Sequence, residues 1–158
     1  CTYRADVSIA YALAPMQLPL RATTPERVEE AERLIASSDV GGADFTLDVV
    51  AAWREHNLAR VGSYLDTYVQ GFRCGDLAIA GLPGEIFVEL GLSLKERSPF
   101  ETTFVVELAN GSDPGYVGTR KAYDEGGYEV TSTLLAPGCG EKLVDASLVL
   151  LNGLEADI

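Results

Sequence analysis

The chain is poor in the residues that carry nucleophilic, redox and metal chemistry. Its 158 residues include one histidine, one methionine, one tryptophan and three cysteines. The cysteines, Cys1, Cys74 and Cys139, are odd in number and show no CxxC spacing, so the sequence indicates neither a disulfide framework nor a cysteine zinc site. Any Ser-His-Asp triad would have to use His56, and no GxSxG motif accompanies it. We therefore interpret His56 as a solvated or capping residue.

Basic residues are also scarce, with 12 Lys and Arg against 24 Asp and Glu, which gives a net charge of −12. This balance disfavours nucleic acid and anionic membrane surfaces as partners, because both attract basic patches. No window of 18 or more apolar residues is present, so the sequence predicts no transmembrane helix. The apolar "IAYALA" near the start has no basic segment before it, so we interpret it as part of the fold rather than as a signal peptide.

What the sequence does contain is an alternation of strand and helix patterns, which predicts a single α/β unit over residues 1–158 with helices packed on a mixed sheet. Gly75 and Asp76 predict a hairpin turn, and the prolines at 15 and 19 restrict their extended segment to a sheet edge. The predicted strands are 3–13, 64–73, 77–82, 102–110 and 128–134, and the predicted helices are 23–36, 45–62, 85–97 and 138–154.

Two polar segments follow predicted strands, "GLPGE" at 81–85 and "ANGSDPGYVGT" at 109–119. Because function in open α/β sheets gathers at the carboxyl ends of strands, Glu85 and Tyr116 are expected to meet there. Taken alone, the spacing favours Glu85 as a carboxylate in the first turn of a helix over Glu85 as a ligand, and Glu89 is an alternative one turn later. Tyr116 alone fits a packing role with a wet hydroxyl. The "GLPGE" segment has too few glycines for a loop that binds nucleotide phosphates.

Longer segments resemble a known family. "GDLAIAGLPGEIFVELGLSLKERSPF" at 75–100 and "FVVELANGSDPGYVGTRKAYDEGGYEV" at 104–130 are similar to the later part of the catalytic domain of neutral/alkaline ceramidases. "LPLRATTPERVEEAERL" at 18–34 and "STLLAPGCGEKLVDASLVLL" at 132–151 are similar to its bacterial members. The order and spacing of these four segments carry the resemblance, which spans most of the chain.

The resemblance implies a zinc amidohydrolase that cleaves the amide of N-acyl sphingosine. In that family two histidines, a glutamate and a tyrosine hold the metal, and the last two match Glu85 and Tyr116. A second family tyrosine, which binds or polarises the substrate amide, matches Tyr128. Such a ligand set leaves one zinc position to water, and a tyrosine hydroxyl can donate to a developing oxyanion.

The chain also departs from the family. The two histidine ligands and the serine motif have no counterpart, and "SDP" is inserted before Tyr116. We therefore expect the C-terminal half of a catalytic domain, which is inactive alone. Its expected partners are the missing N-terminal half of the domain and a small lipid amide substrate, which can lie at a membrane surface. The resemblance favours an exported protein. The alternative is a non-catalytic α/β module that keeps the scaffold for binding or structure.

Overall fold

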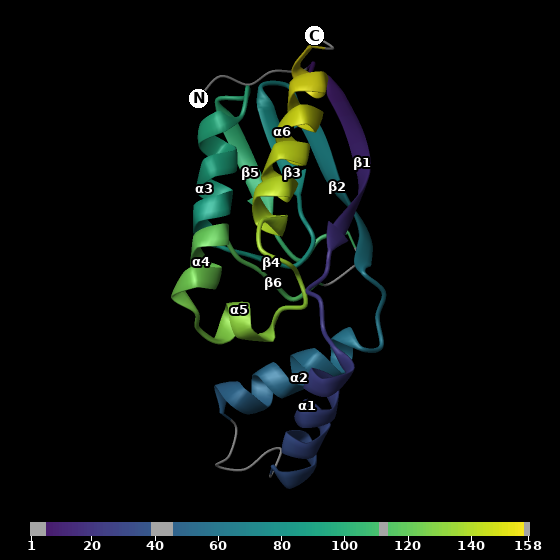
Figure 1. Cartoon of the computed structure of the whole chain (residues 1–158). Coiled ribbons are helices and arrows are strands. Elements are labelled where there is room, and N and C mark those ends of the chain that lie inside the picture. The colour runs from purple at the N-terminus through teal and green to yellow at the C-terminus, as the bar shows by residue number, and fades with distance from the viewer. Residues whose placement is uncertain (1–5, 39–45, 111–113, 157–158) are drawn as a thin grey trace.

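The computed structural model describes residues 6–38, 46–110 and 114–156 as a mixed α/β structure (Figure 1). Four strands form one sheet in the order β1-β2-β3-β5, in which β3 and β5 are parallel and the other pairs antiparallel. A second, two-stranded parallel sheet joins β4 to β6. The strands are β1 Ile9–Pro19, β2 Tyr64–Cys74, β3 Leu77–Gly81, β4 Glu85–Ile86, β5 Thr102–Val106 and β6 Tyr116–Val117. The helices are α1 Pro25–Ser37, α2 Leu47–Leu58, α3 Val88–Arg97, α4 Arg120–Glu125, α5 Tyr128–Ser132 and α6 Cys139–Ala156. The predicted fold class, helices packed on a mixed sheet, is confirmed.

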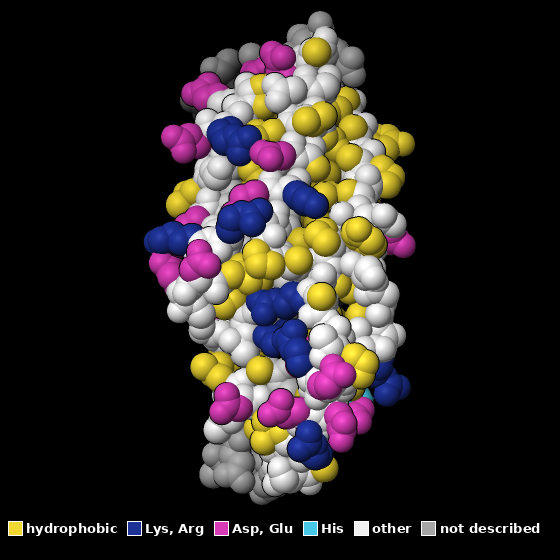
Figure 2. Space-filling model, in the orientation of Figure 1, with side chains coloured by type: hydrophobic (Ala, Val, Ile, Leu, Met, Phe, Trp, Pro, Cys, Tyr) yellow, Lys and Arg dark blue, Asp and Glu magenta, His cyan; other side chains and the backbone are white. Residues whose placement is uncertain are grey.

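Four of the six helices in the described residues form two groups. α3 and α6 pack on one face of the four-stranded sheet, whereas α1 and α2 pair with each other at one end of the molecule (Figure 1). Charged side chains of both signs are spread over the face that the helices cover (Figure 2). Among the helices in the described ranges, none combines the length and the apolar composition needed to cross a membrane.

The main core lies between α6 and the sheet. Leu143 and Leu151 of α6 are fully buried and belong to the same cluster as Val69 and Ala80 of the strands. Gly71 of β2 lies directly beneath this helix, where an added Cβ would approach the Leu150 Cδ2 to 2.0 Å. A glycine in the strand therefore lets the backbone of β2 come close to α6.

Local sequence signals set several boundaries as expected. Thr24 caps α1 by accepting a hydrogen bond from the Arg27 backbone N–H, and Pro25 occupies the first helical position. Gly75, at a φ of +60°, turns β2 into β3 in the predicted hairpin. β1 is an edge strand and contains Pro15 and Pro19, as their missing N–H groups require.

Other predictions about secondary structure were wrong. The predicted strand at 128–134 is instead the short helix α5, which begins after Gly127 and buries Val130; its β-branched residues had suggested a strand. The predicted strand at 102–110 ends at Val106, because Leu108 and Asn110 adopt positive φ angles. The segment 114–127 was expected to be irregular but contains β6 and α4. Residues 3–5 of the predicted strand at 3–13, and Cys1, lie outside the described residues; residues 6–8 are not in the strand, which begins at Ile9 and continues to Pro19.

Candidate functional site

Glu85 lies in a strand, not in the first turn of a helix as one sequence interpretation had it. The predicted helix at 85–97 begins only at Val88, because the Glu85 backbone N–H donates to the Gly115 carbonyl at 2.9 Å and extends β4. Gly84 makes this turn possible. Its φ is +78°, and an added Cβ would lie 2.5 Å from the Gly115 carbonyl oxygen. The position of Glu85 is therefore set by a strand pair that only glycine at 84 permits.

The parallel pairing of β4 and β6 places Glu85 opposite Tyr116, with Ile86 opposite Val117. The negative charge of Glu85 raises the pKa of the Tyr116 phenol above its ordinary value. Partial burial, interactions with Tyr128 and Glu129, and a hydrogen bond to Glu85 act in the same direction. A carboxylate and a phenol from two distant segments thus interact directly.

Tyr128 joins this pair through its ring. It is the first residue of α5, and its ring centroid lies 5.9 Å from that of Tyr116 with an interplanar angle of 77°. This edge-to-face arrangement is a favourable one for aromatic side chains. Tyr128 remains 43% exposed, so part of the residue is accessible from solvent. The structure therefore brings together all three site residues that the sequence and its resemblance had selected.

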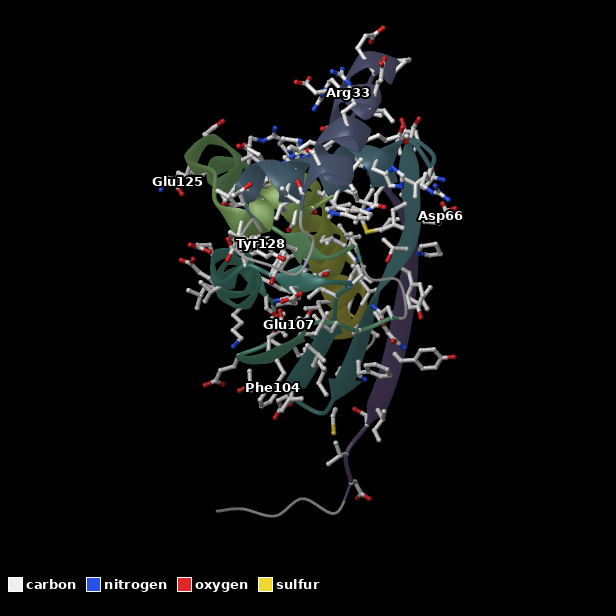
Figure 3. The ribbon with its side chains drawn as sticks, turned by 90° about the horizontal axis from the view of Figure 1, so that it is seen from below. Arg33, Asp66, Phe104, Glu107, Glu125 and Tyr128 are labelled. Carbon is white, nitrogen blue, oxygen red and sulfur yellow. The ribbon has the colours of Figure 1, made fainter. Side chains whose placement is uncertain are left out.

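Glu107 belongs to the same site, and the sequence reasoning missed it. Its carboxylate accepts a hydrogen bond from the Ile86 backbone N–H at 2.8 Å. In the view of Figure 3 the labelled Glu107 lies between Phe104 of β5 and Tyr128. The Leu108 N–H also donates to the Gly84 carbonyl, so the chain after β5 holds the side of β4 away from β6. No sequence motif marks such a contact, because it depends on where β5 ends.

Other candidates do not join the site. Glu89, the alternative carboxylate, lies exposed in the first turn of α3, and its charge acts on Lys121 rather than on Tyr116. His56 of α2 faces Glu32 of α1, with 3.4 Å between its Nδ1 and the carboxylate, and its ring meets Trp53 edge-on. Within the described residues, no three His, Cys, Asp or Glu side chains form a group that could hold a metal ion.

Comparison with known proteins finds a match in structure only. No family model matches the sequence, and no curated protein matches it. One matching structure, described as a ceramidase complexed with C2, is 24% identical with a TM-score of 0.53. The match covers 61% of this chain and 16% of the ceramidase chain. Another, the neutral ceramidase of Pseudomonas aeruginosa, is 16% identical with a TM-score of 0.55 and covers 98% of this chain.

The match to the Pseudomonas aeruginosa enzyme takes up 29% of that chain, so the 158 residues correspond to less than a third of its length. At these identities the comparison establishes the fold and leaves chemistry to the residues themselves. Glu85, Tyr116 and Tyr128 are therefore assembled on a fold that resembles part of the neutral ceramidases.

Proposed function

We propose that this chain forms part of the active site of a zinc-dependent amidohydrolase of neutral ceramidase type, which cleaves the amide of N-acyl sphingosine or a related lipid amide. The observation that carries the proposal is the partnering of Glu85 with Tyr116 across β4 and β6. The two side chains come from segments 31 positions apart (116 − 85), and each follows a loop with a positive-φ glycine, Gly84 or Gly115.

The donor chemistry of this pair fits a zinc ion. Zinc accepts carboxylate oxygen, and a neighbouring cation favours the phenolate form of tyrosine. Without a cation, the Glu85 charge opposes ionisation of Tyr116 and raises its pKa. A divalent cation shared by the two oxygens would remove that opposition. When bound, zinc would supply a Lewis acid for the amide carbonyl and would lower the pKa of a water toward ~7. We propose that the two remaining ligands are histidines from polypeptide outside these 158 residues.

We assign Tyr128 a role at the substrate rather than at the metal. Its ring packs against Tyr116, which fixes the direction of the ring, while its side chain remains accessible. A hydroxyl held in this way can donate a hydrogen bond to the oxygen of the amide as negative charge develops there. Glu107 has a supporting role, because it holds the backbone of β4 next to Glu85.

The test uses protein expressed from the complete reading frame that contains these residues, with zinc measured by mass spectrometry and hydrolysis measured on N-acyl sphingosine. Glu85→Gln and Tyr116→Phe are expected to lower bound zinc and activity together. Tyr128→Phe should keep the zinc and lower kcat by about 10²–10³-fold, as expected for loss of an oxyanion donor. Glu89→Gln is the matched carboxylate control and should change neither quantity.

Unchanged zinc content in both Glu85→Gln and Tyr116→Phe would overturn the proposal and leave the alternative, a non-catalytic α/β module. Under the proposal, the 158 residues alone have no hydrolase activity, because their two oxygen donors do not complete a zinc site. Export from the cell belongs to the same proposal and rests on the resemblance to ceramidases. Fractionation of the source cells with an antibody to this chain tests it separately.

A further inference from the structure

One face of the four-stranded sheet has no helix on it. In the described part of the chain, the helices that pack on these strands are α3 and α6, and both lie on the same side. Side chains along β1 alternate between exposed and less exposed positions, so every second residue points away from the helices. The large apolar side chains that this open face exposes include Ile9, Tyr11, Leu13, Phe72, Phe104 and Val106.

The strand register aligns these residues into a continuous band. Tyr11 lies opposite Phe72, Phe72 opposite Ile79, and Ile79 opposite Phe104, so one apolar row crosses all four strands. The Tyr11 and Phe72 ring centroids are 6.4 Å apart. Two further rows flank it on the same face. One consists of Ile9, Cys74, Leu77 and Thr102, and the other of Leu13, Gln70, Gly81 and Val106.

None of the twelve positions in these three rows of four carries a charge, although 23% of the residues in the chain are charged. A solvated face of an antiparallel sheet normally carries polar residues in alternation with its buried side. A contiguous apolar surface of this kind marks an interface rather than a face made for water.

We propose that this open face packs against a second β-sheet layer of the same protein, contributed by polypeptide outside these 158 residues. The charge-free rows require an apolar occupant, and an apolar sheet face is the surface that packs on another sheet at about 10 Å. The match to the Pseudomonas aeruginosa enzyme supports this occupant, because 98% of this chain accounts for 29% of that one. A fold of this kind thus exists within a much longer chain.

The same layer would lie close to the candidate site. β3 leaves the face at Gly81 and reaches Glu85 after three residues, and β5 leaves it at Val106, directly before Glu107. A layer that covers the sheet therefore has a route to Glu85 and Tyr116, where the proposed function requires further ligands. Only this last step rests on the proposed function; the packing of the face does not.

The test is hydroxyl-radical footprinting of the zinc-free, monomeric protein expressed from the complete reading frame, with labelling corrected for the intrinsic reactivity of each residue type. Phe72 is 38% exposed here and Trp53 of α2 is 37% exposed, so they form a matched pair. We expect labelling of Phe72, Tyr11 and Phe104 to be lost while Trp53 is labelled as its exposure predicts. Labelling of Phe72 comparable to that of Trp53 overturns the proposal.

Two additional outcomes would assign the face to another occupant and also overturn the proposal. These are protection that appears only as the protein dimerises with concentration, and protection that appears only with added phosphatidylcholine vesicles.

As a second arm, Tyr11→Asp on the open face is compared with Val149→Asp on α6, since the two residues are 73% and 75% exposed. We expect a large fall in Tm for Tyr11→Asp alone; an equally small fall in both overturns the proposal. Zinc content is not a readout, so failure here is distinct from failure of the proposed function.

Discussion

Glu85 and Tyr116 are register partners in the parallel pair of β4 and β6, and the charge of the first raises the pKa of the second. Each residue alone has an ordinary explanation, as a surface carboxylate and as a packing tyrosine. Their direct interaction is what distinguishes them, because perturbed pKa values with a specific charged partner gather at functional sites. The pair also gives a readout that does not depend on any enzyme activity.

The first prediction is that Glu85→Gln lowers the pKa of Tyr116 toward that of an ordinary tyrosine. The carboxylate opposes formation of the phenolate, so its replacement by a neutral amide removes the largest cause of the upward shift. NMR titration of the Tyr116 ring against pH measures this change. Glu89→Gln, in the first turn of α3, is the control and should leave the titration unaltered. An unchanged Tyr116 titration in Glu85→Gln would contradict the geometry of the pair.

A second prediction concerns the turn that positions Glu85. Gly84→Ala must place a Cβ at a φ of +78° and 2.5 Å from the Gly115 carbonyl oxygen. The left-handed conformation alone costs about 1–2 kcal/mol for a residue with a side chain, and the contact with backbone adds to that cost. We expect a loss of unfolding free energy beyond that range, measured by chemical denaturation.

Two other glycines separate the causes of that loss. Gly115 has a φ of +71° but no atom within 4 Å of an added Cβ, so Gly115→Ala should show the conformational cost without the contact. Gly91, within α3, has open space and no positive φ, so Gly91→Ala should be neutral or stabilising by roughly 0.5–1 kcal/mol. Equal effects at Gly84 and Gly91 would show that β4 and β6 do not approach as described.

The third prediction is that Glu107 holds β4 in place. Its carboxylate accepts the Ile86 N–H on the side of β4 away from β6, where β4 pairs with no other strand among the described residues. Glu107→Ala should therefore increase hydrogen exchange of the Ile86 amide and reduce the upward pKa shift of Tyr116. Glu107→Gln keeps an acceptor oxygen and should behave more like the wild type. If Ala and Gln behave alike, the hydrogen bond has no positioning role.

The sequence predicted those parts of the fold that depend on local signals. Thr24 and Pro25 start α1 where expected, Gly75 makes the predicted hairpin, and the edge position of β1 follows from its prolines. These features need only the residues that neighbour them along the chain. The length and start of α6 were likewise readable from its apolar stripe.

The parts that failed depend on tertiary contacts. Glu85 was assigned to a helix because β4 is two residues long and exists only through pairing with β6, 31 positions away. Residues 128–132 form α5 although Val130 and Thr131 favour strands, because the helix buries Val130 and follows two positive-φ glycines. The position of two polar segments after predicted strands already suggested that Glu85 and Tyr116 meet. Their roles, and the choice of Tyr128, came from the family resemblance, and Glu107 had no signal at all.

The last prediction concerns Glu55, which links the two helices α1 and α2 at the end of the molecule away from the sheet. Burial alone would raise the pKa of its carboxyl, but hydrogen bonds from Thr23 and Arg54 and the charges of Arg27 and Arg54 outweigh burial and hold the pKa below its ordinary value. Its side chain is 7% exposed, and its oxygens lie 2.6 Å from the Thr23 hydroxyl and 2.7 Å from an Arg54 nitrogen.

A carboxyl with a lowered pKa in the folded state stabilises the fold above its unfolded pKa of 4.5, and this contribution disappears as pH falls through the lower, folded value. Glu55→Gln should therefore cost roughly 1.5–3 kcal/mol at neutral pH, the range for hydrogen bonds to charged groups. The difference from wild type should shrink as the pH is lowered below 4.5. Urea denaturation at several pH values measures both effects, with Glu96→Gln, exposed in α3, as a control that should show neither. A Glu55→Gln penalty that is constant with pH would mean that packing, and not the charge of this carboxylate, joins the two helices.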